Sequence, residues 1–279
     1  MEKAIKKHAV IFILPTLAAF IIGFIVPFVE GLYLSFCKFT TVGNATFVGI
    51  SNYTAAIKDT SFTSSFKFTV LFAIVSILLI NVLAFGLALL LTQKLKGTNI
   101  FRTVFFMPNL IGGIVLGYIW QLLLNGILMN FSRTLTYSST YGFWGLIILM
   151  CWQQIGYMMI IYTTGLNNIP KDLSEAAAID GAGTWQRFKS ITVPMLMPSF
   201  TIVFFLTLSK CFMLLDQNVA LTDGNFSTRM LAMQILYTTR DGSPPDYGLA
   251  QAQAVIFFVL IAAVTLVQVS ITSKKEVEL

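Results

Sequence analysis

The stretch EAAAIDGAGTWQRFKSITVP, residues 175–194, places a polar, alanine-rich segment between two long apolar runs. Good helix formers fill residues 171–180, and the Gly181 that follows is the residue type that most often ends a helix. Thr184 suits the N-cap of a second short helix, and Pro194 marks the start of the next long helix. The stretch therefore predicts two short helices joined at a glycine, forming either an ordinary interfacial loop or an element that a partner protein grips.

The first of these short helices has a face of small side chains. Pro170 suits its first turn, because the ring fixes a helical φ where no N–H partner is needed. Leu173, Ala176 and Ala177 recur at positions i, i+3 and i+4 and so share one face, with Glu175 beside it. Such a face allows another backbone to approach closely.

The composition of the whole chain indicates a membrane protein. Of its 279 residues, 56% are hydrophobic and 11% are charged, whereas a soluble domain carries roughly a quarter charged residues. Uncharged runs of roughly 20 residues or more can each cross the hydrocarbon core as a helix. These runs predict an all-α polytopic membrane protein with six transmembrane helices, in residues 9–29, 68–93, 103–132, 134–170, 190–209 and 247–273.

The distribution of basic residues predicts the orientation of the helices. Eleven Lys and Arg fall in the segments on the side of the termini, and six fall in the segments on the other side. Because cytoplasmic segments carry the excess of Lys and Arg, both termini are predicted to be cytoplasmic. This bias accounts for most of the net charge of +6 without a nucleic acid partner. The first apolar run is too long for a signal peptide and is interpreted as a retained helix.

The predicted organisation has four parts. They are a cytoplasmic N-terminus (1–8), a first helix with an outer segment (9–65), a core (66–273) that contains the cytoplasmic loop 167–194, and a cytoplasmic tail (274–279). The predicted helices cover about residues 9–36, 66–93, 103–132, 142–166, 196–216 and 247–273. The three cysteines are far apart in sequence and the only histidine is His8, so neither a disulfide framework nor a metal site is predicted.

Three polar or irregular features lie inside the predicted spans. The sequence MPNLIGG (107–113) interrupts the third span, and its glycine pair predicts either a close helix contact or a break that lines a cavity. Gln153 and Gln154 lie near the centre of the fourth span. Lys210 and Asp216 are candidates for function in the fifth span, with a structural salt bridge or snorkelling of the lysine as the alternative.

Residues 175–194 resemble the EAA loop of bacterial ABC importer permeases. That pattern is Glu-Ala-Ala, three residues, Gly, nine residues, Ile, one residue, Leu and Pro; this chain matches it except at Val193, where Leu is usual. The outer stretch FVGISNYTAAIKDTSF (47–62) and FRTVFFMPNLIGGIVLGYIW (101–120) are also similar to permeases of the maltose, glycerol-phosphate and oligosaccharide type. The outer-loop stretch ALTDGNFST (220–228) departs from the family pattern, because Asn225 replaces a glycine and a proline is missing. The resemblance implies the type I ABC importer permease fold.

The resemblance also implies partners and a coupling role for the loop 167–194, called the EAA loop below. In the family this loop docks on the ATP-binding subunit, which implies coupling roles for Glu175, Ala176, Ala177, Asp180 and Gly181. The implied partners are a second permease, an ATP-binding subunit dimer that uses ATP and Mg, and an extracellular solute-binding (lipo)protein, in a prokaryotic cell membrane with its lipid. This chain has no P-loop motif, so it is expected to be a transport subunit and not an enzyme.

The family's substrate positions fall on three segments of this chain. They correspond to Asn109, Gly113, Gln153, Gln154, Tyr157, Lys210, Cys211 and Leu214, with Asp216 nearby. Asn, Gln and Tyr suit the hydroxyls of a di- or oligosaccharide, because these side chains donate and accept hydrogen bonds. Several alternatives stay open: a glycerol phosphate, polyamine or other small-solute importer, a secondary transporter, a non-transporting membrane receptor or scaffold, and a permease whose partner makes the main sugar contacts.

Overall fold

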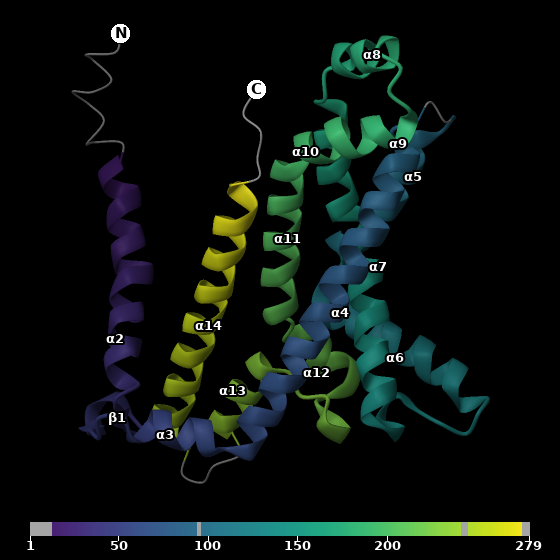
Figure 1. The fold of residues 1–279 in the computed structure, drawn as a ribbon. Helices are drawn as coiled ribbons and strands as arrows, with labels where there is room; N and C mark the ends of the chain where they lie inside the picture. The colour runs from purple at the N-terminus through teal and green to yellow at the C-terminus, as the bar shows by residue number, and fades with distance from the viewer. Residues whose placement is uncertain (1–12, 94–95, 241–244, 275–279) are drawn as a thin grey trace. The chain divides into compact units, whose positions relative to one another are not determined.

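The computed structural model describes residues 13–93, 96–240 and 245–274 (Figure 1). The predicted N-terminal segment 1–8 and all but the first residue of the tail 274–279 lie outside this range. The chain divides into two compact units. The smaller unit comprises Met1–Phe62 and Ile235–Phe258, and the larger comprises Thr63–Gln234 and Val259–Leu279.

Helices long and apolar enough to cross a membrane dominate the described residues. Four are single spans: Ile13–Leu34, α4 (Thr60–Leu91), α7 (Ser139–Asn167) and α14 (Tyr247–Ser273). Two further spans are bent pairs, Thr98–Leu110 with Gly113–Met129 at 102° and Thr184–Met195 with Met197–Phe212 at 62°. When each bent pair counts as one span, the total is the predicted six. α14 covers the predicted range 247–273, whereas α4 begins at Thr60 and not near residue 66.

The smaller unit contains the first span. A π-helical turn at Ile21–Ile25 precedes α2 (Val26–Leu34), and Pro27 lies in the first turn of α2. Because proline removes a backbone donor, the irregular turn lies where Pro27 disturbs the regular hydrogen bonding of the helix. Two strands follow, β1 (Cys37–Lys38) and β2 (Thr46–Phe47), which pair antiparallel. This hairpin corrects the all-α prediction in one small outer segment.

The outer segment of the smaller unit is held by a buried amide. This segment contains one short helix, α3 (Ser51–Lys58). Near its start, the Asn52 side chain donates hydrogen bonds to the carbonyl oxygens of Ser35 (3.0 Å) and Cys37 (2.9 Å). A buried polar group that is fully bonded contributes to stability, whereas an unbonded one costs free energy. Asn52 therefore fixes α3 to the end of the first span.

In the larger unit the third predicted span is broken. α5 (Thr98–Phe106) runs into a 3-10 turn at Met107–Leu110, and α6 (Gly113–Met129) follows. The two intervening residues have extended backbones, which separates the two helices. The prediction of one interrupted helix starting near Thr103 is thus corrected to two helices joined at a sharp bend. Pro108 lies at the start of the turn and limits continuation of α5.

α7 is the central helix of the larger unit. In the most apolar 18-residue part of α7, 61% of the residues are buried inside the chain. The corresponding shares are 28% for α4 and 6% for α14. The predicted helix 142–166 agrees with its observed bounds, Ser139–Asn167. Gln153 and Gln154, near its middle, are both buried, so these polar side chains face other helices and not lipid.

The fifth predicted helix ends early. α11 (Met197–Phe212) stops at Phe212, and α12 (Asp216–Thr222) begins after a break. The prediction that this helix reaches residue 216 is therefore wrong, and Asp216 starts a separate short helix. A 3-10 turn (Asn225–Ser227) and α13 (Leu231–Arg240) follow. The buried Asn218 side chain accepts a hydrogen bond from the Met230 N–H (2.9 Å) and so orders this connection.

Candidate functional site: an exposed helix pair and a polar cavity

The EAA loop forms the two short helices that the sequence predicts. α8 (Lys171–Ile179) is followed by α9 (Thr184–Arg187), a π-helical turn (Phe188–Thr192) and α10 (Val193–Met195). Two caps differ by one residue from the prediction. Pro170 is the N-cap of α8 and not part of its first turn, and Gly183, not Thr184, is the N-cap of α9. In Figure 1, α8 lies beyond the α10 end of α11, while α12 lies at the other end of α11.

Gly181 ends α8 through its backbone conformation. Its φ is +83°, a left-handed value that glycine adopts without the steric cost of a Cβ atom. The Gly181 N–H donates to the Ala178 carbonyl (3.1 Å), and the Ala182 N–H donates to the Ala177 carbonyl (2.9 Å). This pair of bonds is the Schellman motif, which satisfies the last carbonyls of a helix. The predicted helix stop at Gly181 is confirmed.

The α8 to α9 segment presents both charge and apolar surface. Glu175, Ala176 and Asp180 are exposed. Ile179 is 87% exposed and Trp185 is 74% exposed, although both lie in a polar stretch of the chain. Exposed large apolar side chains beside charged groups are typical of a protein contact surface. This surface can therefore bind a partner.

An aromatic cluster connects this segment to the long helices. The Phe188 ring lies 6.2 Å from that of Phe85 on α4. Phe85, Tyr162 of α7 and Phe200 of α11 then pack against one another with centroids 5.0–5.3 Å apart. The Tyr162 hydroxyl donates to the Asn81 Oδ1 atom (2.7 Å). These packed rings thus connect the π-helical turn to α4, α7 and α11.

A polar cavity of about 470 Å³ lies between the 107–110 turn, α7, α11 and α12. Six of its lining residues are predicted site residues: Asn109, Gln153, Gln154, Lys210, Leu214 and Asp216. The lining also contains residues that the sequence did not single out: Met150, Leu206, Ser209, Met213, Leu215 and Gln217. Amides, a hydroxyl, an ammonium and a carboxylate thus meet in one hollow whose remaining wall is apolar.

Two glutamines join the elements around this cavity. The Gln217 Nε2 atom donates to the Gln153 Oε1 atom (2.9 Å), and the Gln153 Nε2 atom donates to the Ile111 carbonyl (3.3 Å). Ile111 lies at the break between α5 and α6, where the backbone needs a new hydrogen-bond partner. Gln153 is 5% exposed. It therefore holds α7, α12 and the helix break in one arrangement.

Gly113 permits the close approach that brings α12 to the cavity. A Cβ atom at Gly113 would lie 2.9 Å from the Cβ of Asp216 and 2.9 Å from the Cδ of Gln217. At Gly112 a Cβ would meet no atom within 4 Å. Of the two alternatives for the glycine pair, Gly113 therefore shows the close helix contact, while the part of this segment that lines the cavity is Asn109. Gly112 makes no such close contact and forms part of the extended backbone between the two helices.

Three of the predicted contact residues are not part of the cavity lining: Gly113, described above, Tyr157 and Cys211. The Tyr157 ring packs beside that of Phe106, with centroids 6.3 Å apart. Cys211 is fully buried. Ser209 and Gln217 are the polar lining residues that sequence reasoning missed. Gln217 directly follows Asp216, but its position depends on the break after Phe212, which no local pattern in the sequence indicates.

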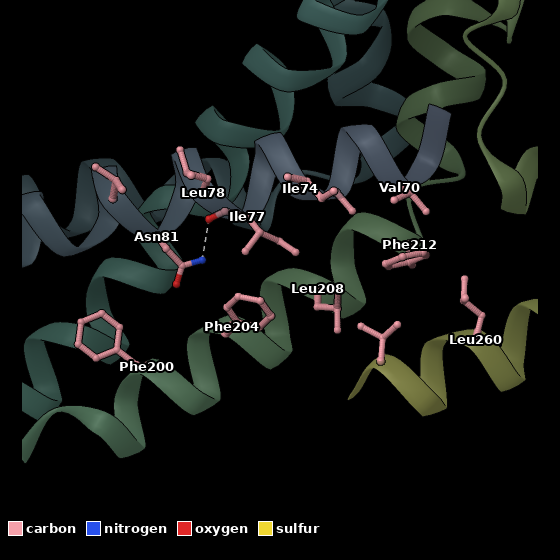
Figure 2. Close-up of a pocket in the computed structure, with 13 residues that line it drawn as sticks. Val70, Ile74, Ile77, Leu78, Asn81, Phe200, Phe204, Leu208, Phe212 and Leu260 are labelled. Carbon is pink, nitrogen blue, oxygen red and sulfur yellow. Dashed lines mark hydrogen bonds between the residues drawn. The ribbon is translucent and has the colours of Figure 1, made fainter. Parts of the chain in front are cut away.

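A second hollow is apolar and differs in character from the cavity. It is a groove of about 550 Å³ between α4, α11 and α14, lined by Ile74, Phe204 and Leu260 among others (Figure 2). Asn81 is its one amide residue, and its Nδ2 atom is turned back to donate to the Ile77 carbonyl (2.8 Å). The groove therefore offers little polar chemistry to a hydrophilic solute. No group of His, Cys, Asp and Glu among the described residues could hold a metal ion.

The membrane-spanning helices, the polar cavity and the exposed helix pair define a multi-pass membrane protein of the transporter class. Comparison with known proteins gives the family: residues 96–276 match the model described as "binding-protein-dependent transport system inner membrane component". The chain belongs to this family of ABC transporter permeases and is a transport subunit. The resemblance identified from the EAA loop is thus confirmed.

Similar proteins extend the match to nearly the whole chain. The probable starch degradation products transport system permease protein AmyD of Thermoanaerobacterium thermosulfurigenes is 40% identical, covering 96% of this chain and 95% of the relative. The multiple sugar-binding transport system permease protein MsmF of Streptococcus mutans is 30% identical over 95% of each. A chain of a bacterial alginate ABC transporter, solved with a periplasmic protein bound to an alginate pentasaccharide, matches with a TM-score of 0.80 at 18% identity. This match covers 98% of this chain and 97% of that one and confirms the predicted permease fold.

Proposed function

We propose that the chain is the permease subunit of an ATP-driven, binding-protein-dependent importer of di- or oligosaccharides. The observation that carries the proposal is the cavity between α7, α11 and α12, whose polar groups are amides and single charges of both signs. Saccharide hydroxyls donate and accept hydrogen bonds, so they match this mixed set. The names of AmyD and MsmF, which refer to starch degradation products and multiple sugars, support the sugar class.

Coupling to ATP is assigned to the EAA loop. Glu175, Asp180 and the small face of Ala176 and Ala177 would contact a separate ATP-binding subunit, with Gly181 fixing where α8 ends. Closure of the ATP-binding dimer would move α8 and α9, and the Phe188 to Phe85 contact would pass this movement to the long helices. The permease would then alternate between two states in which the cavity opens to opposite sides of the membrane.

The proposed assembly contains further subunits. It comprises a second permease, two copies of the ATP-binding subunit with ATP and Mg, and an extracellular solute-binding protein. The alginate transporter structure that this chain resembles includes a periplasmic protein with bound oligosaccharide. In this assembly the EAA loop faces the cytoplasm of a prokaryotic cell, and both termini lie on the same side. The excess of Lys and Arg on that side supports this orientation.

Glycerol phosphate is the second candidate substrate. The sn-glycerol-3-phosphate transport system permease protein UgpA of Agrobacterium fabrum is 28% identical to this chain. Lys210 in the cavity lining supplies one positive charge for a phosphate. Asp216 in the same lining opposes that binding, which favours the saccharide.

Purification of the full chain from its native membrane tests the proposal. An ATP-binding subunit and a second permease should co-purify, and the assembly should import radiolabelled maltotriose when the binding protein and ATP are supplied. Absence of any ATP-binding subunit from the purified complex would overturn the ABC importer assignment. Import of glycerol 3-phosphate without import of any saccharide would overturn the substrate class alone.

A further inference from the structure

The cavity contains two charged side chains that do not neutralise each other by direct contact. Lys210, near the end of α11, and Asp216, at the start of α12, both line it, and both residues are exposed. Within the described part of the chain, neither side chain forms a hydrogen bond or an ion pair. Because neither charge is used by another side chain, both are accessible to a ligand in the cavity and are candidates for function.

A buried acceptor lies in the same lining. Gln154 is 3% exposed, and its Oε1 atom is fully enclosed with no hydrogen-bond partner among the described residues. A buried amide oxygen left without a donor costs free energy that a bound hydroxyl can recover. Gln153, by contrast, is already bonded on both sides, to Gln217 and Ile111. Of the two neighbouring glutamines, Gln154 is therefore the one whose side-chain oxygen has no hydrogen-bond partner among the described residues.

Together these groups specify the chemistry of a ligand. Asp216 and Gln154 offer acceptors, and Lys210 offers three N–H donors. The matching ligand must supply O–H donors and oxygen acceptors on one surface without a net charge. A neutral saccharide does so, because every hydroxyl is both a donor and an acceptor.

We propose that Lys210 and Asp216 form a neutral pair of ligand contacts that selects uncharged saccharides over anionic ones, with Asp216 as the excluding group. This inference rests on the proposed function and names the specificity of the same cavity. Lys210 alone would attract a carboxylate or phosphate, but Asp216 cancels its field at the short distances of one cavity. An anionic ligand then loses its hydration without a compensating charge.

The test compares two ligands that differ by one charge. They are maltotriose and maltotrionic acid, in which oxidation converts the reducing-end glucose to an open-chain gluconate; the contribution of the ring opening cancels when a variant is compared with the wild type. The full chain is kept in its native assembly in nanodiscs of neutral lipid, without the solute-binding protein, so that only the membrane cavity discriminates. Saturation-transfer NMR then gives the ratio of the two Kd values, acid over neutral.

The wild type should show a ratio above one. Asp216→Asn should lower this ratio about tenfold, because it leaves the charge of Lys210 uncompensated. Lys210→Met should raise the ratio, since only the negative charge remains. Asp223→Asn is the matched control, because Asp223 follows α12 but does not line the cavity, and its ratio should equal that of the wild type.

Two outcomes overturn the inference in different ways. In the first, the wild type binds maltotriose but both cavity variants keep the wild-type ratio of Kd values. Selection by charge at Lys210 and Asp216 is then wrong, while the proposed saccharide importer is unaffected. If the complete wild-type importer neither binds nor takes up maltotriose, the proposed function fails and the selection fails with it. Because Lys210→Met and Asp216→Asn shift the ratio in opposite directions, general misfolding cannot imitate the expected pattern.

Discussion

The exposed helix pair and the polar cavity are both polar interruptions of apolar chain, but they are built in opposite ways. The helix pair comes from one continuous stretch, and its surface side chains have open space around them. The cavity is assembled from the 107–110 turn, α7, α11 and α12, and its neighbours are packed within van der Waals contact. Reversal of a surface charge should therefore have its largest effect on coupling in the helix pair, and added side-chain volume should have its largest effect beside the cavity.

The largest effect is expected from charge reversal on α8. Glu175→Arg should lower ATP-dependent maltotriose uptake at least about thirtyfold, because an unmatched charge at a buried interface costs about 2–5 kcal/mol. Asp172→Arg is the matched control, since Asp172 is also exposed on α8 but lies in its first turn. It should cost only the helix-dipole contribution of about 0.3–1 kcal/mol. Equal losses in both variants would show that Glu175 has no specific partner.

A smaller effect is expected where volume is added beside the cavity. Gly113→Ala should reduce uptake and lower the Tm of the purified assembly, because its Cβ would meet Asp216 and Gln217 at 2.9 Å. Overpacking of this kind costs about 1–3 kcal/mol. Gly112→Ala adds the same methyl group where no atom lies within 4 Å. If the two variants behave alike in uptake and melting, α12 does not depend on the close contact at Gly113.

The end of α8 should be sensitive to backbone conformation. Gly181→Ala should weaken binding of the ATP-binding subunit about tenfold, since a left-handed residue with a Cβ atom costs roughly 1–2 kcal/mol. Gly183→Ala is the control: both glycines have open space at Cβ, but only Gly181 has a positive φ. Pull-down with purified ATP-binding subunit measures the difference. If Gly181→Ala binds the ATP-binding subunit as tightly as the wild type, the Schellman turn does not contribute to this binding.

The smallest effect is expected at Tyr157. Tyr157→Phe removes one hydroxyl from a residue that does not line the cavity, so uptake should stay within about twofold of the wild type. The kinetics of maltotriose uptake measure this. A roughly tenfold or greater loss of uptake would show instead that the Tyr157 hydroxyl contacts the substrate. The substrate site would then extend along α7 beyond the cavity lining.

Local patterns made the helix pair predictable. The helix formers before Gly181 and the fixed spacing to Pro194 lie within one stretch, so short-range rules place α8 and α9 to within one residue. The uncharged runs likewise located all six spans, because the length needed to cross a membrane is a property of each segment alone.

The cavity was predictable only in part, because its shape depends on packing between distant segments. Resemblance brought Asn109, Gln154 and Lys210 together, but no local rule showed that α11 stops at Phe212. That break turns Asp216 and Gln217 towards α7 and Gly113, and so it decides which side chains line the hollow. The sequence alone also does not distinguish the two glutamines. Gln153 hydrogen-bonds Ile111 and Gln217, whereas the Gln154 side-chain oxygen has no partner among the described residues, and this difference depends on where Ile111 and Gln217 lie.

Reconstituted transport tests the central claim most directly. The purified assembly is placed in liposomes with the solute-binding protein and radiolabelled maltotriose outside, and uptake is measured with and without the ATP-binding subunit and ATP. Uptake should require both, and Glu175→Arg should remain at the level seen without ATP. Maltotriose entry at the full rate in the absence of the ATP-binding subunit would contradict the account and identify a transporter that needs no ATPase.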